Sequence, residues 1–271
     1  MLRQAWQAAL AVSLLLVGGV ARADVYALGS SYSHDAQPWG LDGRPQWHID
    51  CGRPLQYIFD NPLAPCELTS TIWPLAFALN QFDYVSFQPV AGEGVTQQSD
   101  IDTISFWLTL QPNAVVVIHP TWPLPEQWEE VFHDAEPDNT FTNYSELYGP
   151  DLIQKLREAN PNRIIVSDRI NEIFDSIYHD IENGTGPLVH FEVLFRDGGA
   201  HLGVFGQYIA HNALRRAFGQ RTSVDNSAVP LPRRVRRYFD AKIRATIRET
   251  SGIESGGYEA PAPRLDLRGT R

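Results

Sequence analysis

Val25-Tyr26-Ala27-Leu28-Gly29-Ser30-Ser31 is the stretch of sequence that decides the fold. Four consecutive apolar residues predict a strand that is buried on both faces, and the glycine and serines after them predict a tight turn at its end. Comparable apolar runs follow along the chain, at 84–87, 114–118, 163–166 and 189–195. We expect each of these runs to be a strand of the same sheet.

Segments with a helical spacing of apolar residues lie between these runs, within 72–79, 101–108, 147–156 and 170–181. Apolar strands that alternate with amphipathic helices predict a parallel sheet with helices on both faces. The expected fold class is therefore α/β, a three-layer α/β/α arrangement around a mostly parallel, flavodoxin-like sheet. Ligands of such open sheets bind beyond the carboxyl ends of the strands, so the residues that follow each strand are the candidate site.

The composition of the 271 residues is that of a globular protein, with 43% hydrophobic and 20% charged residues. It excludes a disordered or a fibrous chain. The formal net charge of −10 argues against a nucleic-acid partner, because phosphate binding needs a surface rich in lysine and arginine. This charge is unevenly placed, since residues 221–271 carry +5 and the remaining residues carry −15.

The uneven charge and the apolar pattern divide residues 24–271 into two parts. The α/β domain is expected over 24–220, and a basic helical extension with a flexible end over 221–271. The helix begins near Arg233 and has an apolar side. The helix is expected either to pack on the acidic body of the same chain or to contact an anionic membrane surface or a polyanionic glycan.

Residues 1–23 have the pattern of a cleaved secretory signal peptide. Arg3 precedes an apolar run that ends at Ala21-Arg22-Ala23, a small-x-small cleavage pattern. An N-terminal anchor helix is the alternative, but the run of about 13 residues is shorter than the ~20 needed to span a bilayer. The protein is therefore expected to be secreted or periplasmic, without a transmembrane segment.

Two cysteines, Cys51 and Cys66, lie fifteen positions apart in a stretch rich in proline, glycine and aspartate. In an oxidising compartment they are expected to form a disulfide. A zinc site is the weaker interpretation, because no second pair of cysteines or histidines stands at ligand spacing.

Two of the segments that follow predicted strands carry the chemistry of a nucleophile. Ser31 follows the first strand, and Asp197 and His201 follow the last one. A serine becomes a nucleophile when a histidine takes its proton and a carboxylate orients that histidine. These three residues are therefore the candidate catalytic triad.

The segments that hold these residues resemble the first and last blocks of the SGNH (GDSL-like) esterase and lipase superfamily. The resemblance implies that Ser31 is the nucleophile and that the Ser31 amide forms part of an oxyanion hole. Further donors would come from Gly92 or Gly94, and from Gln88 or Thr121 in place of the family's asparagine.

Three features depart from the family pattern. Ser30 stands where the family has aspartate, and Asp197 and His201 are four positions apart instead of three. The Gly-x-Asn-Asp block is replaced by a segment that begins with His119-Pro120-Thr121-Trp122.

Aromatic residues and histidines near the predicted strand ends suggest how a substrate is held. The tryptophans either form platforms for sugar rings or acyl chains, or belong to the core; they are Trp39, Trp47, Trp73, Trp107, Trp122 and Trp128. His34, His48 and His119 have no partner at metal-ligand spacing, so structural or pocket roles are favoured over a metal site. The connection from Ser31 to Pro65 is expected to form one wall of the pocket.

The expected function is that of an exported serine esterase that cleaves a carboxylic ester of a small molecule or a carbohydrate, with O-acetyl groups on a carbohydrate as one candidate. This chemistry requires no metal or organic cofactor. The alternative is a catalytically impaired SGNH-like periplasmic protein that binds glycans or assists polysaccharide assembly. It is motivated by the missing asparagine block and by the altered spacing between Asp197 and His201.

Overall fold

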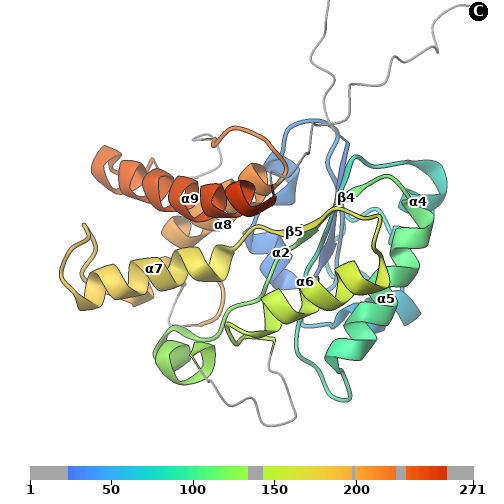
Figure 1. Cartoon of the computed structure of the whole chain (residues 1–271), viewed down its shortest axis with the longest axis horizontal. Coiled ribbons are helices and arrows are strands. Elements are labelled where there is room, and N and C mark those ends of the chain that lie inside the picture. The colour runs from blue at the N-terminus through green and yellow to red at the C-terminus, as the bar shows by residue number, and fades with distance from the viewer. Residues whose placement is uncertain (1–23, 134–142, 197–198, 224–229, 255–271) are drawn as a thin grey trace, which may run out of the picture.

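A sheet of five parallel strands forms the centre of the protein (Figure 1). The computed structural model describes residues 24–133, 143–196, 199–223 and 230–254. The strands have the spatial order β2-β1-β3-β4-β5 and are β1 (Val25–Gly29), β2 (Gln46–Ile49), β3 (Tyr84–Phe87), β4 (Val115–Ile118) and β5 (Ile165–Ser167). The expected flavodoxin-like sheet is thus confirmed. Its order reverses between β1 and β3, where such folds bind their ligands.

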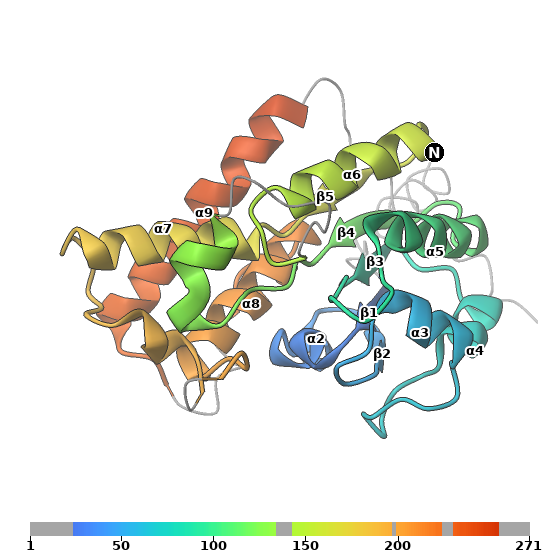
Figure 2. The same ribbon diagram turned by 90° about the horizontal axis from the view of Figure 1, so that it is seen from below.

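Helices cover both faces of this sheet, as the two perpendicular views show (Figures 1 and 2). One face packs against α3 (Leu55–Asp60), α4 (Trp73–Leu79), α5 (Gln97–Leu110) and α6 (Tyr148–Ala159). The other packs against α2 (Ser31–Asp35), α7 (Ile170–Glu182), α8 (Val204–Ala217) and α9 (Arg233–Glu254). Within β1, Tyr26 and Leu28 join the first core and Val25 joins the second, because successive side chains of a strand point to opposite faces.

The segment 189–195 is not a strand, so this prediction is wrong. The chain forms a 3₁₀ helix there, η4 (Phe191–Leu194). Phe191, Leu194 and Phe195 are buried, whereas Val189 is 76% exposed. Burial at intervals of three and four residues is the spacing of a helix, and it outweighs the apolar run that predicts a strand.

The fifth strand comes instead from β2, which the sequence pattern does not reveal. Its residues Gln46-Trp47-His48-Ile49 pair in parallel with Tyr26–Gly29 of β1. The strand lies at the edge of the sheet and is only partly buried, so it lacks the continuous apolar run of the central strands.

A disulfide between Cys51 and Cys66 follows this edge strand, as the sequence predicts. The Cα atoms lie 5.6 Å apart, and the Cys66 amide donates a hydrogen bond to the Ile49 carbonyl at 3.1 Å. In the chain-entropy model, closing a loop of about 15 residues stabilises the folded state by roughly 3 kcal/mol. The disulfide thus fastens the chain beside the carboxyl end of β2.

The basic helix α9 packs on the body of its own chain. Phe239 and Ile243 are fully buried in the core that α7 and α8 share with α9. Lys242 Nζ lies 2.7 Å from Asp180 Oδ2 on α7. The apolar side of the helix is therefore covered, while its outer side exposes the arginines at 233, 234, 237 and 244.

Truncation of Phe239 to alanine is expected to lower the free energy of unfolding by about 3–5 kcal/mol, because it leaves a cavity in the core under α9. Urea unfolding followed by circular dichroism measures this change. Arg237→Ala, on the exposed side of the same helix, is the control and is expected to stay within about 0.5 kcal/mol of wild type. Equal midpoints for the two variants would show that α9 is not part of the cooperative core.

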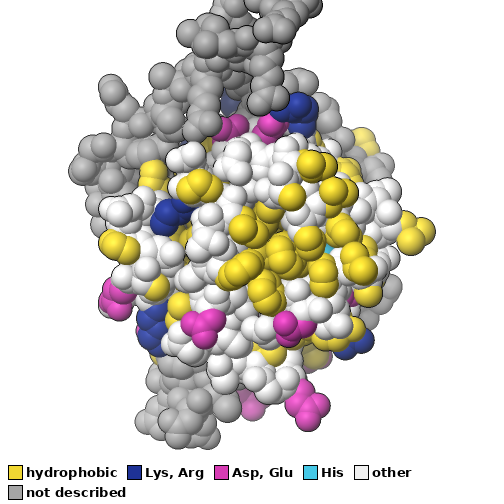
Figure 3. Space-filling view, turned by 90° about the vertical axis from the view of Figure 1, so that its right-hand side faces the viewer, with side chains coloured by type: hydrophobic (Ala, Val, Ile, Leu, Met, Phe, Trp, Pro, Cys, Tyr) yellow, Lys and Arg dark blue, Asp and Glu magenta, His cyan; other side chains and the backbone are white. Residues whose placement is uncertain are grey.

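Apolar side chains gather on the outer face over α4 and α5 (Figure 3). Leu75 and Leu79 of α4 and Phe106 and Leu110 of α5 are among the exposed large hydrophobic residues. Across the described part of the chain, the helices fall short of the length and apolar character that crossing a membrane requires.

Candidate active site

The turn between β1 and α2 is held by one side chain from the neighbouring strand end. Gln88, directly after β3, accepts hydrogen bonds at Oε1 from the amide and hydroxyl groups of Ser30, at 3.2 and 3.0 Å. The same oxygen accepts from the amide and hydroxyl of Ser33, at 2.8 and 3.0 Å. Backbone amides only donate, so these contacts fix which end of the Gln88 side chain faces the turn.

Gly29 makes this close approach feasible. A Cβ atom at this position would lie 2.3 Å from Ser33 Oγ and 2.6 Å from Gln88 Cβ. Both separations are shorter than any van der Waals contact, so a larger residue would push the turn and Gln88 apart. The glycine before the serines is therefore required by packing at the point where the strand order reverses.

Ser31 and Asp35 lie one helical turn apart on α2. Ser30 caps this five-residue helix, and its Oγ accepts a hydrogen bond from the Tyr32 amide. Residues at positions i and i+4 of a helix share one face, with Cβ atoms about 5–6 Å apart. The hydroxyl of Ser31 and the carboxylate of Asp35 are thus carried on the same side of one short element.

His201 meets this face of α2 through the Asp35 carboxylate. Its Nδ1 lies 2.9 Å from Asp35 Oδ2, and the Leu202 amide donates to the same oxygen at 3.0 Å. The Asp35 side chain is 3% exposed, whereas the His201 side chain is 43% exposed. Because Nδ1 is engaged, Nε2 is the nitrogen of His201 that remains for proton transfer.

Asp197, the carboxylate that the sequence assigns to the triad, lies outside the described residues. Asp35 is not among the site residues that the sequence predicts. Its signal is the spacing Ser31-x-x-x-Asp35, which places both side chains on one face once the segment is known to be helical.

A second aspartate–histidine pair lies at the carboxyl ends of β4 and β5. His119 Nδ1 contacts Asp168 Oδ2, and the two side chains are 1% and 0% exposed. His119 Nε2 is buried and makes no hydrogen bond to any described residue. The Trp122 ring packs at 5.8 Å from the His119 ring and at 4.9 Å from the Tyr32 ring, which links this pair to α2.

The residues predicted for the oxyanion hole occupy three different settings. Gln88 Nε2 is buried and unpaired within the described part of the chain. The Thr121 hydroxyl, also buried, lies 3.2 Å from the carbonyl oxygens of Pro89 and Asn143, which take up its only proton. Gly92 and Gly94 are exposed in the connection between β3 and α5.

The tryptophans divide between the core and the surface near α2. Trp107, Trp122 and Trp128 are fully buried and belong to the core. Trp39 is 43% exposed, and its ring lies 4.8 Å from the His34 ring and 6.1 Å from the Trp47 ring. His34 belongs to α2, so this aromatic group borders the helix that carries Ser31.

Burial shifts the pKa values of two ionisable groups near the strand ends. It lowers the pKa of His48 to about 4, so this β2 histidine is neutral at pH 7, and its Nδ1 accepts a hydrogen bond from the Trp73 amide. Burial raises the pKa of Asp100, in the first turn of α5, to about 7, while its carboxyl accepts from the Tyr148 hydroxyl. Neither group contacts His201, and we assign neither to proton transfer at Ser31.

Comparison with solved structures finds proteins of similar architecture, whereas no model of a known protein family and no curated sequence matches the chain. The family 3 carbohydrate esterase of Clostridium thermocellum is 14% identical, with a TM-score of 0.45 over 72% of this chain and 94% of that one. A member of the lipolytic protein G-D-S-L family from Veillonella parvula is 10% identical, with a TM-score of 0.38 over 72% and 98%. The case for an activity rests on the residues described above.

Proposed function

We propose that the protein is a serine esterase in which Ser31 is the nucleophile, His201 the general base and acid, and Asp35 the carboxylate that orients His201. The observation that carries this proposal is the contact of His201 Nδ1 with Asp35 Oδ2 on the helix that begins at Ser31. A hydroxyl, an imidazole and a carboxylate in this order are the parts of a nucleophilic acyl-transfer site.

In this mechanism the Ser31 oxygen attacks the ester carbonyl while its proton passes to His201 Nε2. The resulting imidazolium protonates the departing alcohol, which leaves an acyl group on Ser31. Water then gives a proton to His201 and attacks the acyl group, releasing the acid and restoring the serine. Asp35 accepts hydrogen bonds from His201 Nδ1–H and from the Leu202 amide, which hold the imidazole in place.

The tetrahedral intermediate carries an oxyanion that needs hydrogen-bond donors. We assign this role to the Ser31 amide and to Gln88 Nε2. The Gln88 Nε2 protons have no hydrogen-bond partner among the described residues. Removing one such donor typically costs 10²–10³ in kcat. Gln88 would thus have two tasks, since its oxygen also holds the turn that presents Ser31.

The choice of His201 over His119 as the base follows from access. The His119 side chain is almost completely buried, whereas His201 is exposed to the extent that a substrate and a water molecule can reach it. A general base must come within hydrogen-bond reach of the proton that it takes. His119 and Asp168 would then support the floor of the site.

The proposed substrate is an ester on a carbohydrate, with O-acetyl groups as the first candidate. Partly exposed Trp39 and Trp47 next to α2 offer flat apolar surfaces of the kind on which sugar rings stack. The disulfide-bonded connection that carries Trp39 and Trp47 would form one wall of the site.

Export of the protein belongs to the same proposal. The signal-like segment 1–23 lies outside the described residues, while the disulfide between Cys51 and Cys66 suits an oxidising compartment. A secreted or periplasmic enzyme would meet acetylated polysaccharides there, and its chemistry needs no metal or organic cofactor.

A fluorophosphonate probe, together with hydrolysis of p-nitrophenyl acetate, tests the proposed function. Wild-type protein is expected to be labelled at Ser31, as peptide mapping would show, and to hydrolyse the ester; Ser31→Ala is expected to lose both. Absence of labelling and of turnover on acetylated glycans would overturn the proposal. Glycan binding that persists in Ser31→Ala and His201→Ala, without turnover in wild type, would instead establish the glycan-binding alternative.

A further inference from the structure

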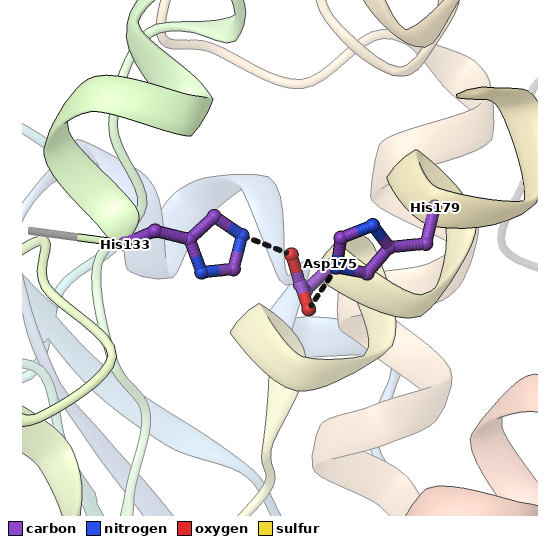
Figure 4. Close-up of side chains that lie close together, drawn as sticks. All are labelled: His133, Asp175 and His179. Carbon is purple, nitrogen blue, oxygen red and sulfur yellow. Dashed lines mark ion pairs between the residues drawn. The ribbon is translucent and has the colours of Figure 1, made fainter.

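Three side chains with metal-binding atoms lie close together, with their ligand atoms facing one another (Figure 4). His133 directly follows the π-helical turn η3 (Trp128–Phe132), and Asp175 and His179 lie one turn apart on α7. One ligand atom from each residue lies within 4.8 Å of the others. We propose that these residues bind a divalent transition-metal ion, with zinc as the best fit.

The separations between the ligand atoms suit a tetrahedral ion. His133 Nε2 is 2.9 Å from Asp175 Oδ1, and His179 Nε2 is 3.5 Å from Asp175 Oδ2. Zinc bonds of about 2.0–2.1 Å to imidazole and carboxylate place neighbouring ligands roughly 3.4 Å apart. The two observed separations lie on either side of this value, but each histidine faces a different oxygen of Asp175. An ion between the rings would therefore be bound by both carboxylate oxygens, or the side chains would rotate to share one oxygen.

His133 supplies the second, independent observation. Its Nε2 is buried and makes no hydrogen bond within the described residues, although it lies 2.9 Å from a carboxylate oxygen. The two atoms approach each other without the alignment of a hydrogen bond. An ion bound by both atoms would satisfy the nitrogen.

Neighbouring groups are placed to support such a site. The indole of Trp128 donates to Asp175 Oδ1 at 3.1 Å, which holds the carboxylate toward η3. Glu146 Oε2 lies 3.6 Å from His133 Nδ1, the nitrogen that would not bind the ion. Metal-binding histidines usually donate their second ring nitrogen to a carboxylate, which fixes the tautomer of the ring. Glu146 is the nearby carboxylate that could take this role after a small approach, since 3.6 Å is longer than a hydrogen bond.

The set of donor atoms selects the class of ion. Two imidazoles and one carboxylate favour zinc and related first-row ions, whereas calcium and magnesium prefer sites made of oxygen alone. Glu129 Oε2, 4.0 Å from His133 Nε2, or a water molecule would complete four-coordination. The three protein ligands would thus leave one position that faces solvent.

An ion at this position would join two parts of the chain that are distant in sequence. His133 lies in the connection between β4 and α6, and α7 follows β5. A cross-link between them would hold that connection, which also carries Trp122, against α7. The site is independent of the proposed ester chemistry, so its test does not depend on finding a substrate.

Zinc titration of chelator-treated full-length protein tests the site. We expect binding of one ion per chain by calorimetry, a rise in Tm of about 5 °C at zinc concentrations near 100 Kd, and visible absorption bands of a tetrahedral ion when cobalt replaces zinc. Calcium and magnesium are expected to produce none of these effects.

His133→Gln and His179→Gln are each expected to weaken zinc binding at least 100-fold and to abolish the cobalt bands. His179 is exposed on α7, so its substitution leaves the core intact. His190→Gln, which replaces an exposed histidine outside the cluster, is the matched control and is expected to bind as wild type does. Equal zinc affinity in wild type and in the two cluster variants, or no binding by wild type, would overturn the proposal.

Discussion

Replacing Asp35 with asparagine is expected to lower kcat for p-nitrophenyl acetate about 10⁴-fold, the loss typical of this substitution in a serine triad. The asparagine side chain has nearly the same volume, so α2 should remain in place. Its amide group can donate to His201 Nδ1, however, and this stabilises the tautomer in which Nε2 carries the proton. An imidazole in that state cannot take the proton of Ser31.

Asp197→Asn is the control, because Asp197 is the carboxylate that the sequence predicts for the triad. We expect this substitution to change kcat less than 10-fold. Both variants should be compared at equal folded fraction, as judged by their thermal unfolding. A large loss in Asp197→Asn combined with a small one in Asp35→Asn would return the role of orienting carboxylate to Asp197.

Replacement of His201 by glutamine is expected to lower kcat by about 10⁶-fold, since loss of the base costs about as much as loss of the whole triad. Glutamine can still donate its amide to Asp35 but cannot accept and return a proton. The KM for p-nitrophenyl acetate should change little, because the imidazole mainly serves the transition state. Rates measured with enzyme in excess would separate acylation from release of the product.

His119→Gln is the matched substitution in the buried pair. It leaves Asp168 with a different partner in a site that excludes water, so we expect lower stability and a kcat that stays within about 10-fold of wild type for the folded fraction. If His119→Gln were inactive while stably folded, and His201→Gln were active, the buried pair would be the proton-transfer group.

The sequence predicts the strands that consist mostly of apolar residues, and it fails at β2 and at 189–195. β1, β3, β4 and β5 are recognisable because apolar residues make up most of each strand. β2 is hidden by its polar residues at the edge of the sheet. The segment 189–195 has the apolar composition of a strand, but it forms a 3₁₀ helix whose buried residues are spaced as on one helical face.

The candidate site is predictable where its chemistry is local in sequence. Ser31 stands out because a buried strand and a glycine precede it, and the disulfide follows from the number of cysteines. Asp35 does not stand out, because a five-residue helix is too short to show an amphipathic period. Its contact with His201 joins residues 166 positions apart, and one sequence contains no signal for such a contact.

The placement of Ser31 and Asp35 on α2, opposite His201, also determines when the site exists during synthesis. A ribosome makes the nucleophile and its carboxylate almost at the outset, but the base arrives only after the whole sheet has been translated. A nascent chain would therefore contain Ser31 and Asp35 before His201 is made, and it would not be able to cleave an ester by the proposed mechanism. In the proposed mechanism, hydrolysis would start only once α8 has docked beside α2, so the activity would belong to the fully folded chain.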